Sequence, residues 1–173
     1  SNGMFTDLIN MYGITETTVH VTYRKLSPEE KLKSNIGKPI DDLQAYVLDK
    51  ELNPLPIGVV GELYVGGAGL GRGYLNKPGL TKEKFIDNPF ATEKDKKEGY
   101  TRLYKTGDLV RWLADGCLDF IGRNDFQVKI RGFRIELEEI ENVLFTLEGI
   151  KQVTVQARNR RSEENANNYL VAY

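Results

Sequence analysis

The stretch 122–141, GRNDFQVKIRGFRIELEEIE, changes its hydrophobic period halfway along. From residue 127 to residue 131 polar and apolar side chains alternate, which is the two-residue rhythm of a short exposed strand. Gly132 supplies a turn, and the alternation then resumes. From Glu136 onward the apolar residues fall at helical spacing, with the glutamates on the solvent side; they are Leu137, Ile140, Val143, Leu144 and Leu147, against Glu136, Glu138, Glu139 and Glu141. The stretch therefore predicts a hairpin followed by an amphipathic helix.

The rest of the chain predicts mostly short strands separated by Gly, Pro, Asn and Asp. The expected strands are 44–48, 61–65, 103–105, 109–113 and 118–121, a strand within 7–13, and two more at 153–157 and 169–173 after the helix. Helical turns are expected at 27–30, with a Ser-Pro start, and from Thr81 to Phe85. The charge run 94–98 predicts a solvated loop. The pattern favours an α+β fold with a β-rich body followed by a small α+β unit.

Composition narrows the function classes. The 173 residues are 40% hydrophobic and 28% charged with a net charge of −1, so no global field favours nucleic acid or an acidic membrane. The single Cys117 excludes an internal disulfide and a cysteine-based metal site. No apolar run approaches the roughly 20 residues that span a bilayer, and the N-terminus lacks a signal-peptide pattern. We expect a cytoplasmic protein, and an excised fragment, because the chain ends on apolar strand residues.

The segment 10–16, NMYGITE, is the first candidate for chemistry. A loop that offers an aromatic ring, a hydroxyl and a carboxylate within five residues suits a nucleotide, since these groups stack on a base, bond a phosphate and hold Mg²⁺. The alternative is a polar turn with a half-buried Tyr12. The lone His20 is most simply a partly buried polar residue, without a second His, Ser or Cys to complete a triad or metal site.

Three further segments carry weaker signals. The glycine run 66–74 fits no G-x-G-x-x-G register and no Gly-Lys-Ser/Thr ending, so its glycines predict tight backbone packing. In 104–109, Asp108 follows a glycine and suits a ribose diol, although an Asx turn explains this segment better when it is taken alone. The cationic residues of 122–141 form either a solvated face or a basic rim for phosphates.

Together and in this order, four runs resemble the core motifs of adenylate-forming enzymes, specifically the amino-acid adenylation domains of non-ribosomal peptide synthetases. The runs are NMYGITETT, GELYVGGAGLGRGYLNKP, YKTGDLVRWLADG and GRNDFQVKIRGFRIELEEIE, and they span nearly the whole chain. The resemblance implies that an amino-acid carboxylate attacks the α-phosphate of Mg·ATP to give an aminoacyl adenylate and pyrophosphate. A phosphopantetheine thiol on a carrier-protein domain then takes the aminoacyl group as a thioester, beside neighbouring synthetase domains.

The resemblance also implies domains and residue roles. Residues 1–34 would end the large core subdomain, 35–124 would form a distorted barrel-like subdomain, and 125–173 would begin the C-terminal lid subdomain. The implied catalytic residues are Thr15 at the phosphate and Glu16 at Mg²⁺. The implied nucleotide-binding residues are Asn10 and Tyr12 at the adenine, Gly13, Thr15, Asp108 at the ribose hydroxyls, Phe120 and Arg123. The implied substrate pocket is Met11, Val19 and His20, the hinge is Asp125, and the hairpin of the thioester step carries Lys129, Arg131 and Gly132.

Two departures from the family pattern leave alternatives open. Ile14 stands where the family usually has proline, which should loosen the turn, and Glu138 replaces a usual glycine, a variant that also occurs in ligases charging D-alanine onto carrier proteins. An acyl- or aryl-acid ligase of the same superfamily and a non-catalytic β-rich interaction module remain alternatives. The phosphate loop, the aspartate for the substrate amino group and the late lysine of the family are absent from the chain. We therefore expect the isolated chain to be inactive, and pyrophosphate exchange by it would contradict this.

Overall fold

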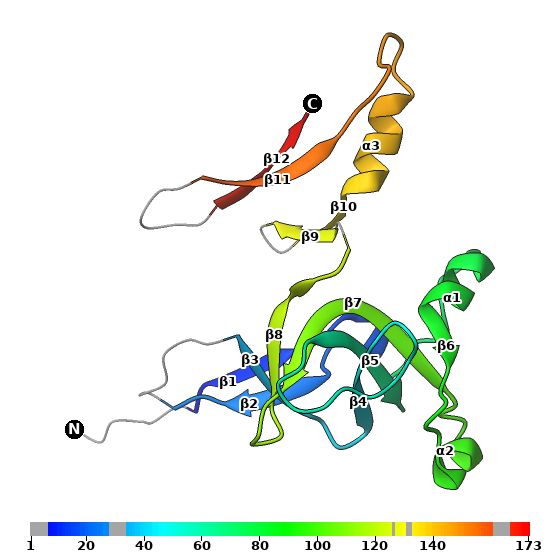
Figure 1. The fold of residues 1–173 in the computed structure, drawn as a ribbon. Coiled ribbons are helices and arrows are strands. Elements are labelled where there is room, and N and C mark those ends of the chain that lie inside the picture. Colours follow the sequence, from blue (N-terminus) through cyan, green and yellow to red (C-terminus); the bar gives the residue numbers. More distant parts are fainter. Residues whose placement is uncertain (1–6, 28–33, 126, 131–132, 161–166) are drawn as a thin grey trace. The chain divides into compact units, whose positions relative to one another are not determined.

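The computed structural model describes residues 7–27, 34–125, 127–130, 133–160 and 167–173. They form two compact units, Ser1–Asn124 and Asp125–Tyr173. The first unit is an antiparallel sheet of eight strands in the order β1-β2-β3-β8-β7-β5-β4, with β6 also paired to β7 (Figure 1). The strands are β1 (Ile9–Tyr12), β2 (Thr22–Lys25), β3 (Asn35–Pro39), β4 (Leu43–Leu48), β5 (Gly61–Gly67), β6 (Phe85–Asp87), β7 (Arg102–Trp112) and β8 (Leu118–Arg123).

The sheet is strongly curled. β3 and β4 are joined by the short link from Pro39 to Leu43, whose four Cα steps span at most about 15 Å. In a flat sheet, however, four strand spacings would separate these strands by about 19 Å. One core cluster accordingly contains buried side chains of β3 and of β4 together with those of the strands between them; its members are Val21, Ile36, Leu43, Val47, Leu63, Val65, Val110 and Leu118. The expected β-rich, barrel-like architecture is thus confirmed.

Two short helices flank the sheet, α1 (Pro78–Lys84) and α2 (Glu93–Glu98). The prediction of a loop at 94–98 is wrong, because Thr92 and Asp95 form a reciprocal capping box and Gly99 closes the helix in a left-handed conformation. The helix predicted to begin at Thr81 begins three residues earlier, at Pro78, and ends at Lys84. Phe85 instead begins β6, where its buried ring packs on Tyr104 with 5.0 Å between centroids.

β7 is a single long strand where two were predicted. Gly107, with φ +76°, lies in its middle, and the register shifts between Leu109 and Val110 against β8. The Thr-Gly-Asp sequence therefore interrupts the regular pairing of β7. The strand nevertheless continues past it, because β7 is paired with β5 on one side and with β8 on the other. This irregularity turns Asp108 toward the candidate site described below.

The second unit contains β9 (Gln127–Ile130), β10 (Phe133–Glu136), α3 (Leu137–Phe145), β11 (Val155–Arg160) and β12 (Asn167–Ala172). β9 pairs with β10, and β11 with β12, both antiparallel. The predicted hairpin, helix and strand pair are confirmed. The turn residues 131–132, and residues 28–30 of the helical turn expected after Ser27, lie outside the described residues.

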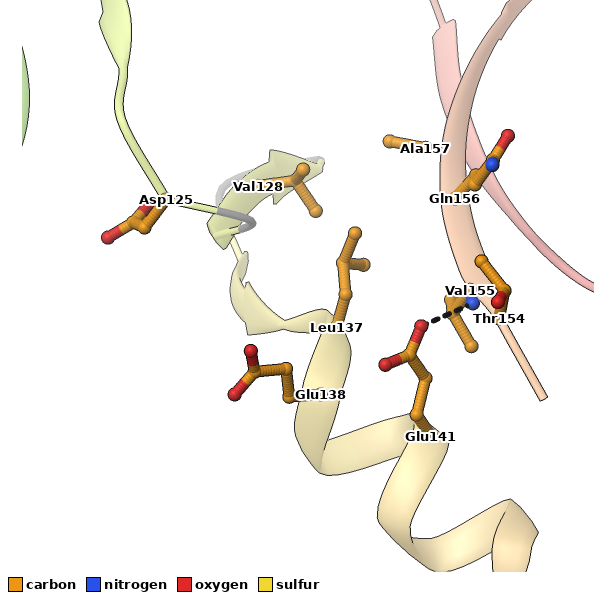
Figure 2. A pocket seen from close by; sticks show the side chains of 9 residues that line it. All are labelled: Asp125, Val128, Leu137, Glu138, Glu141, Thr154, Val155, Gln156 and Ala157. Carbon is orange, nitrogen blue, oxygen red and sulfur yellow. Dashed lines mark hydrogen bonds between the residues drawn. The ribbon is translucent and has the colours of Figure 1, made fainter. Parts of the chain in front are cut away.

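α3 keeps most of the predicted face, because Ile140 and Leu144 are partly buried and Glu138 and Glu139 are exposed, but some positions differ. Leu137 is buried, but Val143 and Leu147 are 65% and 54% exposed. Glu141, expected on the solvent side, accepts a hydrogen bond from the Val155 N–H at 2.7 Å and so ties the helix to β11 (Figure 2). With nine residues, α3 is the longest helix in the described part of the chain, and no helix there is long and apolar enough to cross a membrane.

Candidate functional site

The loop after β1 is a tight turn with little freedom to change. A Cβ added to Gly13 would lie 1.8 Å from the Val19 carbonyl oxygen, so only glycine fits. The Val21 N–H donates to the Tyr12 carbonyl at 2.8 Å and closes the turn. Thr18 and Val19 have φ of 59° and 76°, which is unusual for β-branched residues and typical of turns fixed by their surroundings. Gly13 to His20 is therefore a closely constrained excursion from the sheet.

Ile14 anchors this turn. Its side chain is buried against Phe85 and Tyr104, and its carbonyl accepts hydrogen bonds from the N–H groups of Thr17 and Val19, each at 3.2 Å. Its φ of −139° is outside the range that proline allows. The expectation of a loosened turn therefore finds no support here. Apolar packing and hydrogen bonds hold the backbone at Ile14, as a proline ring would do by restricting its dihedral angle.

Glu16 lies on the 3₁₀ helix η1 (Thr15–Thr17), against the glycine run. Its Oε1 accepts a hydrogen bond from the Tyr74 hydroxyl at 2.7 Å, and that hydroxyl lies 3.2 Å from the Tyr104 hydroxyl. Burial, together with these two neighbours, raises the pKa of Tyr74, so its proton stays available to the carboxylate. Thr15, the preceding residue, is exposed.

The glycine run packs backbone against backbone, as predicted. Gly67 has φ +109°, and a Cβ there would lie 2.4 Å from the Asp42 carbonyl oxygen. The Gly71 N–H donates to the Glu16 carbonyl at 2.8 Å. The run therefore supports the turn that carries Glu16 and is structural.

Asp108 is the centre of the buried polar cluster. Its side chain is 4% exposed, and Arg123 Nη1 donates to Oδ1 at 2.5 Å. The Tyr12 hydroxyl donates to Oδ2, across 96 residues of sequence. Burial, and then the negative charge of Asp108, raises the pKa of Tyr12, so this hydroxyl remains a donor. The carboxylate is thus held at both oxygens, and each oxygen keeps further lone pairs for a ligand.

Further contacts orient this cluster. The Asp108 N–H donates to Thr106 Oγ1 at 2.9 Å, and Arg123 Nη2 donates to the Thr106 carbonyl at 3.2 Å. The Phe120 ring is 6.3 Å from the Tyr12 ring between centroids. Asn10 lies two residues before Tyr12 on β1 and donates to the Asn35 carbonyl at 3.0 Å. The structure therefore brings together Tyr12, Asp108, Phe120 and Arg123, with Asn10 next along the strand.

The predicted pocket residues lie apart from this cluster. Met11 and Val19 are 43% and 62% exposed, and Met11 faces the opposite side of β1 from Tyr12 because side chains alternate along a strand. His20 is exposed as well, so its expected partial burial is wrong. The turn that closes against Gly13 carries it outward.

In the second unit, Asp125 Oδ1 accepts a hydrogen bond from the Gln127 N–H at 3.2 Å. Asp125 also lines a cavity of about 520 Å³ with Val128, Leu137, Glu138 and Glu141, among others (Figure 2). Lys129 lies on β9 opposite Arg134. The remaining hairpin residues, Arg131 and Gly132, are outside the described residues.

The sequence pattern alone did not single out Glu62, Tyr74 or Thr106. Each supports a predicted site residue through a hydrogen bond to its side chain or to the backbone beside it. A charged residue inside the apolar strand sequence GELYV was the available signal for Glu62. Tyr74 and Thr106 carry no signal beyond their places in motif-like runs.

Buried tyrosines give the chain a pH signature. The pKa of Tyr12, Tyr46, Tyr64 and Tyr74 is raised, chiefly by burial, and reaches about 12 for Tyr64. The unfolded chain releases these protons near pH 10, so their contribution to stability is complete below that pH and is lost as pH rises through the folded pKa values. We expect at least these four of the nine tyrosines to resist ionisation in the folded chain until it unfolds. Tyrosinate absorbance with and without denaturant measures this, and nine tyrosines ionising together near pH 10 in the folded chain would contradict it.

Comparisons with known proteins agree with this geometry. Residues 2–75 match the family described as AMP-binding enzyme. The chain is 51% identical over 160 residues to tyrocidine synthase 3 of Brevibacillus parabrevis, covering 91% of this chain and 2% of that protein. It is 60% identical over 140 residues to a dimodular nonribosomal peptide synthase of Bacillus subtilis (strain 168), covering 79% of this chain and 6% of that protein. The chain thus spans only a small part of the curated relatives it matches.

Solved structures give the same result. PA1221, described as an NRPS protein containing adenylation and PCP domains, superposes with a TM-score of 0.78 at 31% identity, covering 96% of this chain and 32% of that chain. A four-domain nonribosomal peptide synthetase bound to AMP and glycine superposes with a TM-score of 0.60 at 42% identity, covering 96% and 12%. With the fold, the family match and the identity to curated relatives in agreement, the chain belongs to the AMP-binding enzyme family and corresponds to part of a nonribosomal peptide synthetase adenylation domain.

Proposed function

We propose that this chain is part of an ATP-dependent ligase that activates an amino acid as its aminoacyl adenylate and passes it to a carrier protein. The observation that carries the proposal is the buried Tyr12–Asp108–Arg123 cluster next to the turn that presents Thr15 and Glu16. Its relatives are peptide synthetases. In the first step the amino-acid carboxylate oxygen bonds to the α-phosphorus of ATP, and the bond to the pyrophosphate oxygen breaks.

Asp108 suits a ribose diol because a diol is a neutral double donor. The diol needs an acceptor with available lone pairs, which the Asp108 carboxylate provides. Arg123 compensates the charge of that carboxylate, and Tyr12 fixes the orientation of the carboxylate. The rings of Tyr12 and Phe120 supply apolar surface for adenine, and Asn10 and Gly13 border the same strand end. Adenylyl transfer depends on such positioning and on charge stabilisation more than on a protein nucleophile.

Glu16 fits the role of a Mg²⁺ ligand. Mg²⁺ in nucleotide sites is held by one or two carboxylates together with substrate phosphates. Within the described ranges no group of three or more His, Cys, Asp or Glu side chains gathers into a metal site, so a single carboxylate beside bound phosphates is the arrangement that the chain offers. Bound Mg²⁺ would stabilise the charge that develops on the phosphates. Thr15 is exposed on the same turn, within reach of a phosphate oxygen in this proposal.

The second step belongs to the same proposal. The phosphopantetheine sulfur of a carrier protein bonds to the aminoacyl carbon, and the bond to AMP breaks. Asp125 would be the hinge, Lys129, Arg131 and Gly132 would lie on the hairpin serving this step, and Met11, Val19 and His20 would line the amino-acid pocket. Residues 1–34, 35–124 and 125–173 would be the core, barrel-like and lid parts. Use of ATP favours a cytoplasmic location.

Pyrophosphate exchange by the whole protein tests the proposal, with L-amino acids, D-alanine and aryl acids as substrates. Exchange with one or a few L-amino acids is expected. Exchange with D-alanine or an aryl acid alone would favour the other ligases of the superfamily. Failure to exchange with any of them, in a protein shown to be folded, would favour a non-catalytic module. Calorimetric titration of the 173-residue chain with AMP and Mg·ATP separately asks whether the described half-site binds nucleotide.

A further inference from the structure

Glu62 is a nearly buried carboxylate that joins two distant segments. It is the second residue of β5, and its side chain is 11% exposed. Oε1 accepts a hydrogen bond from the Gly107 N–H at 3.0 Å, and Oε2 accepts one from Asn124 Nδ2 at 2.9 Å. Lys105 Nζ lies 3.8 Å from Oε2. A carboxylate persists out of water only when such partners satisfy it, so this geometry is specific.

The two partners of Glu62 lie directly before residues with proposed functional roles. Gly107 directly precedes Asp108 and sits at the irregularity of β7. Asn124 is the last residue of the first unit, directly before Asp125. The Asn124 N–H also donates to the Gly107 carbonyl at 2.9 Å, so Glu62, Gly107 and Asn124 form a closed set of three. Asn124 is therefore tied, directly and through Glu62, to the segment that carries Asp108.

We infer that Glu62 is a positioning residue that holds the ribose-binding turn at Gly107 and the fixed end of the hinge at Asn124 as one assembly. The inference rests on the proposed function for the roles of Asp108 and Asp125. Without Glu62, the Gly107 N–H and the Asn124 amide lose a common acceptor. Asp108 then loses the fixed backbone on which its orientation depends, and the pivot of the second unit spreads over more residues.

The structural arm of the test is amide hydrogen exchange in the whole protein. In Glu62→Leu we expect peptides containing Gly107 and Asn124 to exchange about tenfold faster. Asp119→Leu is the matched control, because Asp119 is also a mostly covered carboxylate of this sheet, 16% exposed and paired with Arg111 at 2.9 Å. Glu62→Gln should restore slow exchange, since its amide oxygen can accept from Gly107 and its NH₂ can donate to a flipped Asn124.

The functional arm separates the two ends of the assembly. Glu62→Leu should raise the KM for ATP in pyrophosphate exchange by about tenfold. Asn124→Ala, which leaves the Gly107 contact in place, should keep that KM and lower thioester formation relative to exchange. A wild-type protein that makes no adenylate contradicts the proposed function. This inference is contradicted if the wild-type protein is active and the Glu62→Leu variant matches Asp119→Leu both in its amide hydrogen-exchange rates and in its KM for ATP.

Discussion

Asp108→Asn is expected to lower amino-acid-dependent pyrophosphate exchange by the whole protein about 100-fold. Two ribose hydroxyls would lose a charged acceptor, and a hydrogen bond to a charged group contributes about 1.5–3 kcal/mol. The same change leaves the Arg123 guanidinium, only 12% exposed, without its carboxylate. Breaking a buried ion pair on one side costs about 3–5 kcal/mol of folding stability. Exchange kinetics and urea unfolding measure the two effects.

Two control variants keep these effects apart. Asp119→Asn removes the ion pair with Arg111, which also joins β7 and β8. Because that pair is more exposed, its loss should lower folding stability by only about 0–1 kcal/mol. Pyrophosphate exchange should not change. Asp108→Asn combined with Arg123→Met removes both charges, so stability should recover while exchange stays low. Wild-type exchange in Asp108→Asn, or recovery of exchange in the double variant, would remove Asp108 from the nucleotide site.

Local patterns predicted much of the fold. The change of period in 122–141 predicted β9, β10 and α3, since strand and helix place successive side chains differently. The same reasoning missed α2, where a charge run hid the capping box of Thr92 and Asp95. It also missed β3, which contains Gly37 and Pro39 and is held by pairing with β2 and β8. Tertiary pairing overrides local propensity at such strands.

The candidate site was predictable in its residues but not in its contacts. The motif resemblance singled out Tyr12 and Asp108, yet their hydrogen bond spans 96 residues and depends on how the strands of the sheet are arranged. Glu62 shows the same limit, because its partners Gly107 and Asn124 lie 45 and 62 residues away. For α3 the periodicity identified a helix and misplaced Glu141. A carboxylate that accepts a strand N–H is invisible to a hydrophobic pattern.

Gly13→Ala is expected to have the second large effect. The added methyl group would lie 1.8 Å from the Val19 carbonyl oxygen and 2.7 Å from His20 Cα, and both are backbone atoms that no rotamer change moves. Overpacking typically costs about 1–3 kcal/mol, and a clash this close belongs at or above the upper end. We expect urea unfolding to show a loss of about 3 kcal/mol. AMP binding should be lost with it, because the turn connects Tyr12 to Glu16.

Gly79→Ala is the matched control for this prediction. Gly79 lies in α1, and a Cβ there meets nothing within 4 Å. Alanine should therefore stabilise the chain by about 0.5–1 kcal/mol, since glycine is the poorer helix former. If Gly13→Ala and Gly79→Ala unfold alike and bind AMP alike, the turn from Gly13 to His20 is not closed in solution. If only Gly13→Ala loses both properties, the closed turn is what brings Glu16 and the Tyr12–Asp108 pair to one ligand.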